Sequence, residues 1–158
     1  MADQDLPAGV TTALDRDTVS ATAEVPAPAG DVFDFVRSPA NHPEISGDGS
    51  VKGNRTGPEL LGPGDRFGMA MKLGVPYRMT STVREFEDGR LIAWAHPGGH
   101  RWRWQVEALG GDRCRVTETF DLSTGLFPPA LRLAGFPKRH ERNVATSVAN
   151  VAAHFARP

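Results

Sequence analysis

Three side chains in the second half of the chain could carry out acid–base chemistry, and Glu118 is the most unusual of them. It lies in the alternating segment 114–121, on the face that otherwise carries apolar residues. A carboxyl group facing an apolar cavity has a raised pKa, so it could act as acid or base or hydrogen-bond a ligand hydroxyl. The alternative is that Glu118 pairs with a nearby arginine or reaches solvent at the rim, since charged residues rarely stay buried unpaired.

His96 and His100 flank the turn Pro97-Gly98-Gly99 and could move a proton near neutral pH at a cavity mouth. Their spacing also suits a metal, but two ligands on a glycine loop are too few for a zinc site. The alternative is that both are exposed turn residues. His42 would join them only if segment 39–45 folds towards the same opening, which the sequence leaves undecided.

A predicted hairpin over 100–121 positions these groups. Both halves alternate with period two, which is typical of strands with one buried face, and 110–112 supply a glycine-containing loop. Cross-strand pairs then form on both faces. The predicted pairs are Trp102 with Phe120, Trp104 with Glu118 and Val106 with Val116 inside, and Arg101 with Asp121 and Glu107 with Arg115 outside.

The side occupied by Trp94 depends on the turn that precedes this hairpin. A two-residue turn at Gly98-Gly99 would put Trp94 on the outer face, where it would be a candidate contact for a homodimer. A three-residue loop, 97–99, would instead put Trp94 opposite Trp102 on the inner face. Both registers are compatible with the sequence.

The remaining segments complete an α+β pattern. Residues 1–16 are polar and aperiodic, which indicates a flexible tail before a single domain over 17–158. Two short helical pieces follow the first strand, and an amphipathic helix extends from Lys138 to the C-terminal end. The other predicted strands cover 18–25, an irregular edge strand within 47–56, 66–73, 77–86 and 90–96.

Composition restricts the functional classes. The 158 residues carry a net charge of −1, which gives no overall field favouring nucleic acid or acidic membranes. One cysteine, Cys114, excludes an internal disulfide and favours a reducing compartment, so we expect a cytoplasmic protein. The sequence shows no secretory signal, no membrane span and no need for a cofactor or metal.

About seven antiparallel strands, curved around one long helix, would leave a cavity between sheet and helix. Met and aromatic side chains on the inner face suit a permissive apolar pocket, although plain core packing is an equal alternative. The candidate ligand-binding residues are Phe67, Met69, Met71, Tyr77, Met79, Trp102, Trp104, Phe120, Phe136, Val144 and Val148.

Three phrases of the chain carry a family resemblance: Val25-Pro-Ala-Pro-Ala-Gly-Asp-Val-Phe-Asp-Phe-Val, Ser38-Pro-Ala-Asn-His-Pro and Val116-Thr-Glu-Thr-Phe-Asp. Over about residues 18–156 the sequence resembles the START-like helix-grip superfamily, and within it the bacterial polyketide cyclase/dehydrase group. The resemblance implies a helix-grip fold and an apolar cavity. It also implies a mouth formed by the 74–76 turn, the 97–100 loop and the 122–130 connection.

Three functional hypotheses follow. The first is a carrier or sensor that binds a small apolar or aromatic molecule. The second is a cyclase or dehydratase acting on a polyketide-like substrate, in which Glu118, assisted by His96 or His100, moves protons. The third is a protein-interaction module with a filled core. The orientation of Glu118 and the histidines relative to the cavity discriminates the first two.

Overall fold

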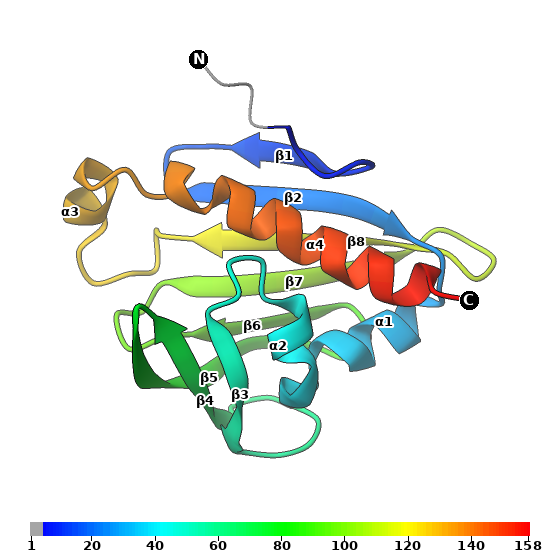
Figure 1. Cartoon of the computed structure of the whole chain (residues 1–158), viewed down its shortest axis with the longest axis horizontal. Helices are drawn as coiled ribbons and strands as arrows, with labels where there is room; N and C mark the ends of the chain where they lie inside the picture. The colour runs from blue at the N-terminus through cyan, green and yellow to red at the C-terminus, as the bar shows by residue number, and fades with distance from the viewer. Residues whose placement is uncertain (1–4) are drawn as a thin grey trace.

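A curved antiparallel sheet forms most of the molecule, and a long helix lies across one of its faces (Figure 1). The computed structural model describes residues 5–158, apart from the side chains at positions 54 and 55. The strands are β1 (Thr11–Leu14), β2 (Thr18–Val25), β3 (Val51–Thr56), β4 (Arg66–Leu73), β5 (Val75–Glu87), β6 (Leu91–Ala95), β7 (Arg101–Ala108) and β8 (Cys114–Asp121). The helices are α1 (Ala29–Val36), η1 (Pro39–Asn41), α2 (His42–Ile45), α3 (Pro128–Leu133), η2 (Lys138–His140) and α4 (Glu141–Ala156).

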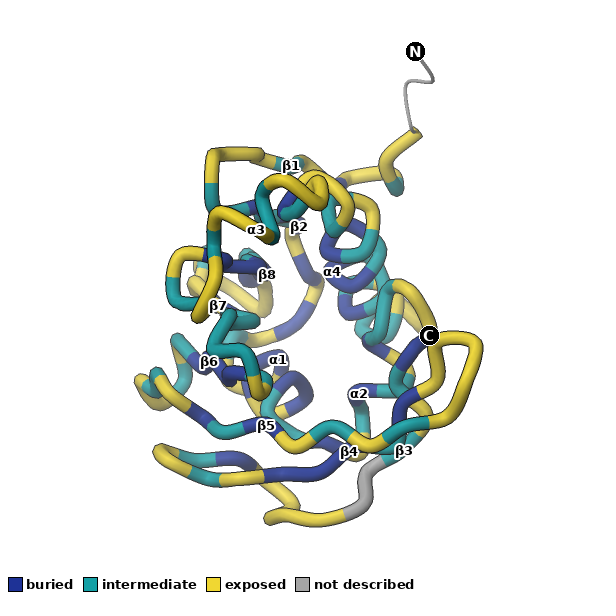
Figure 2. Tube along the Cα trace, turned by 90° about the vertical axis from the view of Figure 1, so that its left-hand side faces the viewer, coloured by how far each residue is buried: buried dark blue, intermediate teal, exposed yellow. Residues whose placement is uncertain are grey.

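The strand order is β1-β2-β8-β7-β6-β5-β4-β3, so β2 crosses over to lie beside the last strand. The alternation in β2 and β8 turns their apolar residues to the inner face, where α4 packs against both strands. From β8 the sheet curves through β7, β6 and β5, so that β4 and β3 come round to the side on which α2 and α4 lie (Figure 2). One helix does not fill the space under this sheet, and a cavity remains (below).

The sheet has one strand more than the sequence pattern predicted. Thr11–Leu14, placed in the tail by the sequence, pairs with β2 as strand β1, and Val10 before it is buried. The threonines have high strand propensity, and the Thr12 hydroxyl donates to Glu141 Oε1 at 3.0 Å. The tail prediction for residues 1–4 lies outside the described residues.

The predicted hairpin register is confirmed on the inner face. Trp104 pairs with Glu118 and Trp102 with Phe120 across β7 and β8. Trp94 of β6 lies opposite Trp102, so the three-residue alternative for the 97–99 loop is correct. Trp94 is buried, with an exposed fraction of 8%, and is therefore not a surface contact.

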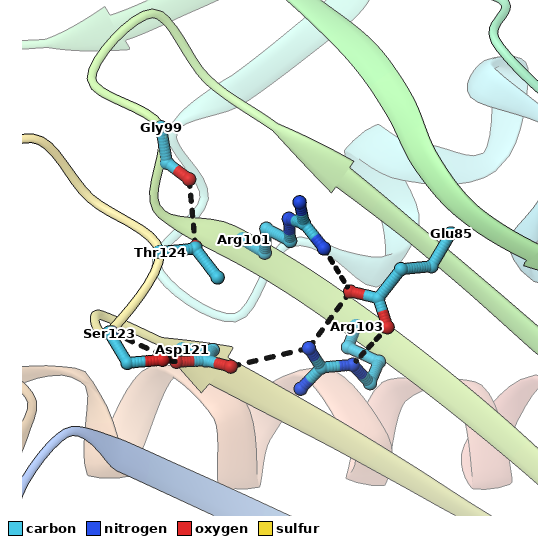
Figure 3. Close-up of polar contacts among 7 residues, drawn as sticks. All are labelled: Glu85, Gly99, Arg101, Arg103, Asp121, Ser123 and Thr124. Atoms are coloured by element: carbon cyan, nitrogen blue, oxygen red, sulfur yellow. Dashed lines mark hydrogen bonds and ion pairs between the residues drawn. The ribbon is translucent and has the colours of Figure 1, made fainter.

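The outer face differs in one detail from the predicted pairs. Arg101 does lie opposite Asp121 in the register, but its guanidinium pairs with Glu85 of β5 at 2.9 Å. Arg103 contacts both Glu85 and Asp121, at 2.9 and 3.2 Å (Figure 3). Glu85 lies two strands from β7, in line with Arg103 across the small Ala93 of β6, so the long arginine side chains reach over β6 to its carboxylate. The predicted pair Glu107–Arg115 is confirmed at 3.0 Å.

Candidate functional site

A cavity of about 280 Å³ lies between the sheet, α2 and α4. Its volume is just below the range of about 300–1,000 Å³ for ligand sites, and its wall is mainly aromatic and methionine side chains. All three tryptophans of the chain line it. The apolar lining residues are Ile45, Val51, Phe67, Met69, Met71, Leu73, Tyr77, Met79, Trp94, Trp102, Trp104, Phe120, Leu131 and Phe136. The polar lining residues are His42, Ser46, Asp48, Ser50, Ser81, His96, His100, Glu118, His140, Asn143 and Ser147.

Nine of the eleven residues predicted to bind a ligand line this cavity, and two do not. Val144 and Val148 are fully buried on the side of α4 that packs against the sheet. Asn143 and Ser147, one position earlier in each turn, face the cavity instead. Adjacent residues on a helix point in directions about 100° apart, so one side chain can face the cavity while the next packs in the core.

Glu118 projects from β8 into the cavity wall with an exposed fraction of 5%. Burial raises the pKa of its carboxyl well above the usual range, although the nearby Ser147 hydroxyl opposes part of the rise. In the described part of the chain it makes no ion pair, and its Oε2 atom is buried without a hydrogen-bond partner. Glu118 is therefore held as a neutral carboxylic acid that can donate a hydrogen bond into the cavity.

Asp48, in the α2–β3 loop, has the opposite protonation preference. Burial would raise its pKa, but hydrogen bonds outweigh burial and lower it. Its Oδ1 accepts from the Ser50 amide at 2.9 Å and from the Ser46 hydroxyl at 3.1 Å. The cavity thus combines an ionised carboxylate with a neutral carboxylic acid, and such separation of pKa values allows distinct acid and base roles.

Three histidines cluster around Trp102 and Phe120. His96 and His100 lie with ring centroids 5.3 Å apart, and the His140 ring lies 4.4 Å from that of Phe120. Burial lowers the pKa of His96 and His140 to about 4, and it also lowers the pKa of His100. All three are neutral imidazoles near pH 7, able to accept a proton.

His42 lines the cavity, but one of its ring nitrogens is already hydrogen-bonded to the protein backbone. Its Nε2–H donates to the Val36 carbonyl at 2.8 Å, and its ring stacks on Trp94 with centroids 4.9 Å apart. Burial lowers the pKa of His42 to about 4. This side chain supports the cavity wall from α2.

His140, Asn143 and Ser147 line the cavity but were not predicted from the sequence. They follow the helical spacing i, i+3, i+7, and this polar stripe continues with Asn150, whose amide donates to the Ile45 carbonyl at 3.2 Å. A polar stripe beside the apolar stripe of a buried helix is a readable signal. Only apolar residues of this helix, Val144 and Val148, were predicted to line the cavity.

Three connections contribute residues to the cavity lining: the β4–β5 turn with Leu73, the β6–β7 loop with His100, and the segment from β8 to α4 with Leu131 and Phe136. The last two are joined, because the Leu126 amide donates to the Gly98 carbonyl at 2.9 Å. The Thr124 hydroxyl donates to the Gly99 carbonyl at 2.8 Å (Figure 3). A Cβ on Gly99 would lie 2.8 Å from the Thr124 carbonyl oxygen, and the backbone there has φ +86°, so only glycine suits this contact.

Within residues 5–158, no group of three histidine, cysteine or carboxylate residues is arranged to hold a metal ion. The same residues include no helix long and apolar enough to cross a membrane. Cys114 is fully buried, and burial raises the pKa of its thiol. It is a core residue rather than a nucleophile.

Fold and cavity together define a START-like helix-grip domain. The chain belongs to the family described as polyketide cyclase / dehydrase and lipid transport, whose profile matches residues 16–156. An uncharacterised protein from Mycobacterium tuberculosis is 40% identical over 144 residues, covering 88% of this chain and 64% of that protein. The chain therefore spans just under two thirds of the length of the curated relatives it matches.

Solved structures share the fold at low sequence identity. An aromatase/cyclase from a Streptomyces species has a TM-score of 0.67 at 20% identity, covering 89% of this chain and 93% of that one. A START superfamily protein from Mycobacterium smegmatis has a TM-score of 0.63 at 15% identity, covering 87% and 98%. Norcoclaurine synthase from Thalictrum flavum, in complex with dopamine and hydroxybenzaldehyde, has a TM-score of 0.58 at 14% identity, covering 92% and 87%.

The close approach of Gly47 to α4 gives a first testable prediction. Its amide donates to the Ser147 hydroxyl at 3.1 Å, and an added Cβ would lie 2.1 Å from the Asn143 carbonyl oxygen. We expect Gly47→Ala to displace the loop and lower the free energy of unfolding by roughly 1–3 kcal/mol in urea titrations. Gly30→Ala is the control, since a Cβ there meets nothing within 4 Å. Equal stability of the two variants would contradict the contact.

The histidine cluster gives a second prediction. The ordinary pKa is 6.5, and that of His96 and His140 falls to about 4 in the folded protein. Between these values the unfolded chain binds more protons, so the free energy of unfolding should fall as pH drops from 6.5 towards 4. We expect His140→Gln to weaken this dependence. NMR titration of the ring carbons checks the values, and a His96 midpoint near 6.5 would refute them.

Proposed function

We propose that this domain binds one small, neutral, largely apolar or aromatic molecule that carries oxygen atoms. The observation behind the proposal is a cavity walled by aromatic and methionine side chains, in which two lining residues each carry a buried polar atom without a partner. These atoms are Trp102 Nε1, which can only donate, and Glu118 Oε2. A carbonyl or hydroxyl oxygen on the ligand would satisfy such groups, and buried polar atoms rarely stay unpaired.

Charge should select against anions. The wall contains the Asp48 carboxylate, and the described lining residues include no lysine or arginine. A ligand carboxylate would lose its hydration without gaining a cationic partner, and it would further disfavour ionisation of Glu118. A neutral hydroxyl or carbonyl carries no such cost. The ligand class expected is therefore a phenol, ketone or similar oxygenated ring system rather than a fatty acid anion.

A matched set of ligands tests the proposal. The three tryptophans in the wall make intrinsic fluorescence a direct report of occupancy. At pH 7 we expect 2-naphthol to bind more tightly than naphthalene or 2-naphthoate, by about tenfold for each hydrogen bond gained. Equal affinity for the naphthol and the naphthoate would refute selection for neutral ligands. No response to any of the three would refute the cavity as a site for aromatic molecules.

A second candidate function is a cyclase or dehydratase. It is favoured by the shared position of a neutral carboxylic acid and neutral histidines in one cavity wall. In dehydration of a β-hydroxy ketone, His96 or His100 would take the proton from the α-carbon. Glu118 would protonate the departing hydroxyl, giving the enone and water. The domain would supply the acid, the base and a cavity that orients the chain.

Turnover of an aryl β-hydroxy ketone, followed through the absorbance of the enone, separates the two candidates. If the domain is an enzyme, Glu118→Gln removes turnover but keeps affinity for 2-naphthol. If it is a carrier or sensor, neither protein forms the enone. The third hypothesis, a protein-interaction module, expects a filled core, and a cavity of about 280 Å³ does not favour it.

A further inference from the structure

Exposed apolar side chains gather on the connections that contribute residues to the cavity lining. Eight large hydrophobic residues are exposed in the described part of the chain, and five of them lie on two of these connections, the β4–β5 turn and the β8–α4 segment. Their exposed fractions are 60% for Leu73, 72% for Val75, 74% for Leu126, 72% for Phe127 and 92% for Leu133. We call these five residues the mouth rim. The other three, Leu6, Leu14 and Leu60, are 38–47% exposed and lie on other segments.

The topology places the mouth rim at one end of the molecule. The β4–β5 turn, the β6–β7 loop and the end of β8 belong to antiparallel neighbours, so all three lie at the same edge of the sheet. Figure 2 looks onto this end, with α3 and the pair β4–β5 on opposite sides of the view. Leu73 lines the cavity itself, so the mouth rim is continuous with the cavity wall.

Positive charge accompanies these side chains. Segments 72–78, 96–100 and 122–140 contain five lysines and arginines but no aspartate or glutamate, in a chain of net charge −1. The cations are Lys72, Arg78, Arg132, Lys138 and Arg139. Arg132 pairs with Asp17 and Lys138 with Glu141, both from neighbouring segments. In residues 5–158, no ion pair to an acid is found for the other three. The near-zero net charge of the chain predicted no affinity for acidic membranes. The positive charges are nevertheless distributed unevenly and are concentrated in these segments.

We propose that the mouth rim docks on the surface of an anionic lipid bilayer. Apolar side chains flanked by lysines and arginines are the chemistry of an interfacial membrane contact, with cations at the lipid phosphates and apolar groups below them. The mouth rim comes from two separate connections, the β4–β5 turn and the β8–α4 segment. A fluid bilayer can receive separate projecting side chains, whereas a stable protein interface needs a complementary surface of about 800 Å² on each partner. An apolar ligand could then pass between bilayer and cavity without crossing water.

Vesicle co-sedimentation of the full chain tests this proposal. The probes are vesicles of phosphatidylcholine and of an equimolar mixture of phosphatidylcholine and phosphatidylglycerol. We expect binding to the anionic vesicles that weakens as salt rises. Phe127→Ser with Leu133→Ser should reduce the partition coefficient at least about tenfold, since both side chains insert apolar area. Lys72→Glu with Arg78→Glu should do the same, because each cation near the surface contributes about fivefold. Leu14→Ser with Lys52→Glu, exposed positions away from the mouth, is the matched control.

Three outcomes would overturn the proposal. One is the absence of sedimentation with anionic vesicles at low salt. Another is binding that the mouth-rim variants and the control variant retain equally. The third is self-association, measured by light scattering, that the same mouth-rim variants abolish while vesicle binding is absent, which would assign the surface to a second copy of this chain. Ligand affinity from tryptophan fluorescence is measured without vesicles, so failure of this proposal is distinguishable from failure of the proposed function.

Discussion

Replacing Glu118 by glutamine should make the protein more stable relative to the wild type as pH rises. Glu118 has an ordinary pKa of 4.5, and burial raises it well above that value in the folded state. Between these two values the folded protein keeps a proton that the unfolded chain has lost. The wild-type stability contributed by this group is therefore complete below pH 4.5 and is lost as pH rises through the folded pKa. Glu118→Gln cannot ionise and removes this dependence.

The stability difference between the two proteins should widen by about 1.4 kcal/mol for each pH unit within that window. Urea unfolding of both proteins over a pH series from 4 upwards measures it. Glu107→Gln is the control, because Glu107 is exposed on the outer face of the same hairpin and pairs with Arg115. Parallel pH profiles for wild type and Glu118→Gln would show that Glu118 is ionised in the folded protein.

Filling the cavity from β5 should abolish ligand binding while the fold persists. Ser81 lines the cavity, has an exposed fraction of 2% and pairs with Phe67 on β4. Ser81→Phe places a phenyl ring in space that a small ligand would occupy, within a volume of about 280 Å³. We expect affinity for 2-naphthol to fall roughly a hundredfold, about 2.7 kcal/mol. Stability should change by less than about 1.5 kcal/mol, since the ring enters vacant volume.

Thr80→Phe is the matched control, because Thr80 is the neighbouring residue on the same strand and is exposed on the other face. Tryptophan fluorescence titrations measure the affinities, and urea unfolding verifies that both variants fold. Unchanged affinity in Ser81→Phe would place the binding site outside this cavity. Loss of affinity in both variants would point to a general disturbance of β5.

The strands and their pairing could be predicted from the sequence where the alternation of apolar and polar residues determines them. Alternation fixed the β7–β8 register, and with it the position of Glu118 opposite Trp104. Strand β1 was missed because its four residues carry little alternating apolarity and become ordered through pairing with β2. Trp94 could not be placed, because the two turn lengths that decide its face differ by a single residue.

Many individual cavity-lining residues could be predicted from the sequence, but the way in which distant segments combine to form the cavity could not. The inner-face residues of the strands were found because period two separates the faces fully. On α4 the boundary between core and cavity falls between adjacent residues, so Val148 was chosen and Ser147 missed. The α2–β3 loop brings Asp48 to the cavity through long-range contacts, such as Gly47 with Ser147, that no local pattern encodes.

Native mass spectrometry of the purified wild type beside Ser81→Phe, with denaturing extraction of any bound compound, tests most directly whether the cavity is a ligand site. We predict that the wild type carries a small, neutral, oxygen-containing apolar molecule, or takes up 2-naphthol when none is retained, and that Ser81→Phe does neither. A wild type that is empty and that binds 2-naphthol no better than the blocked variant would contradict the account.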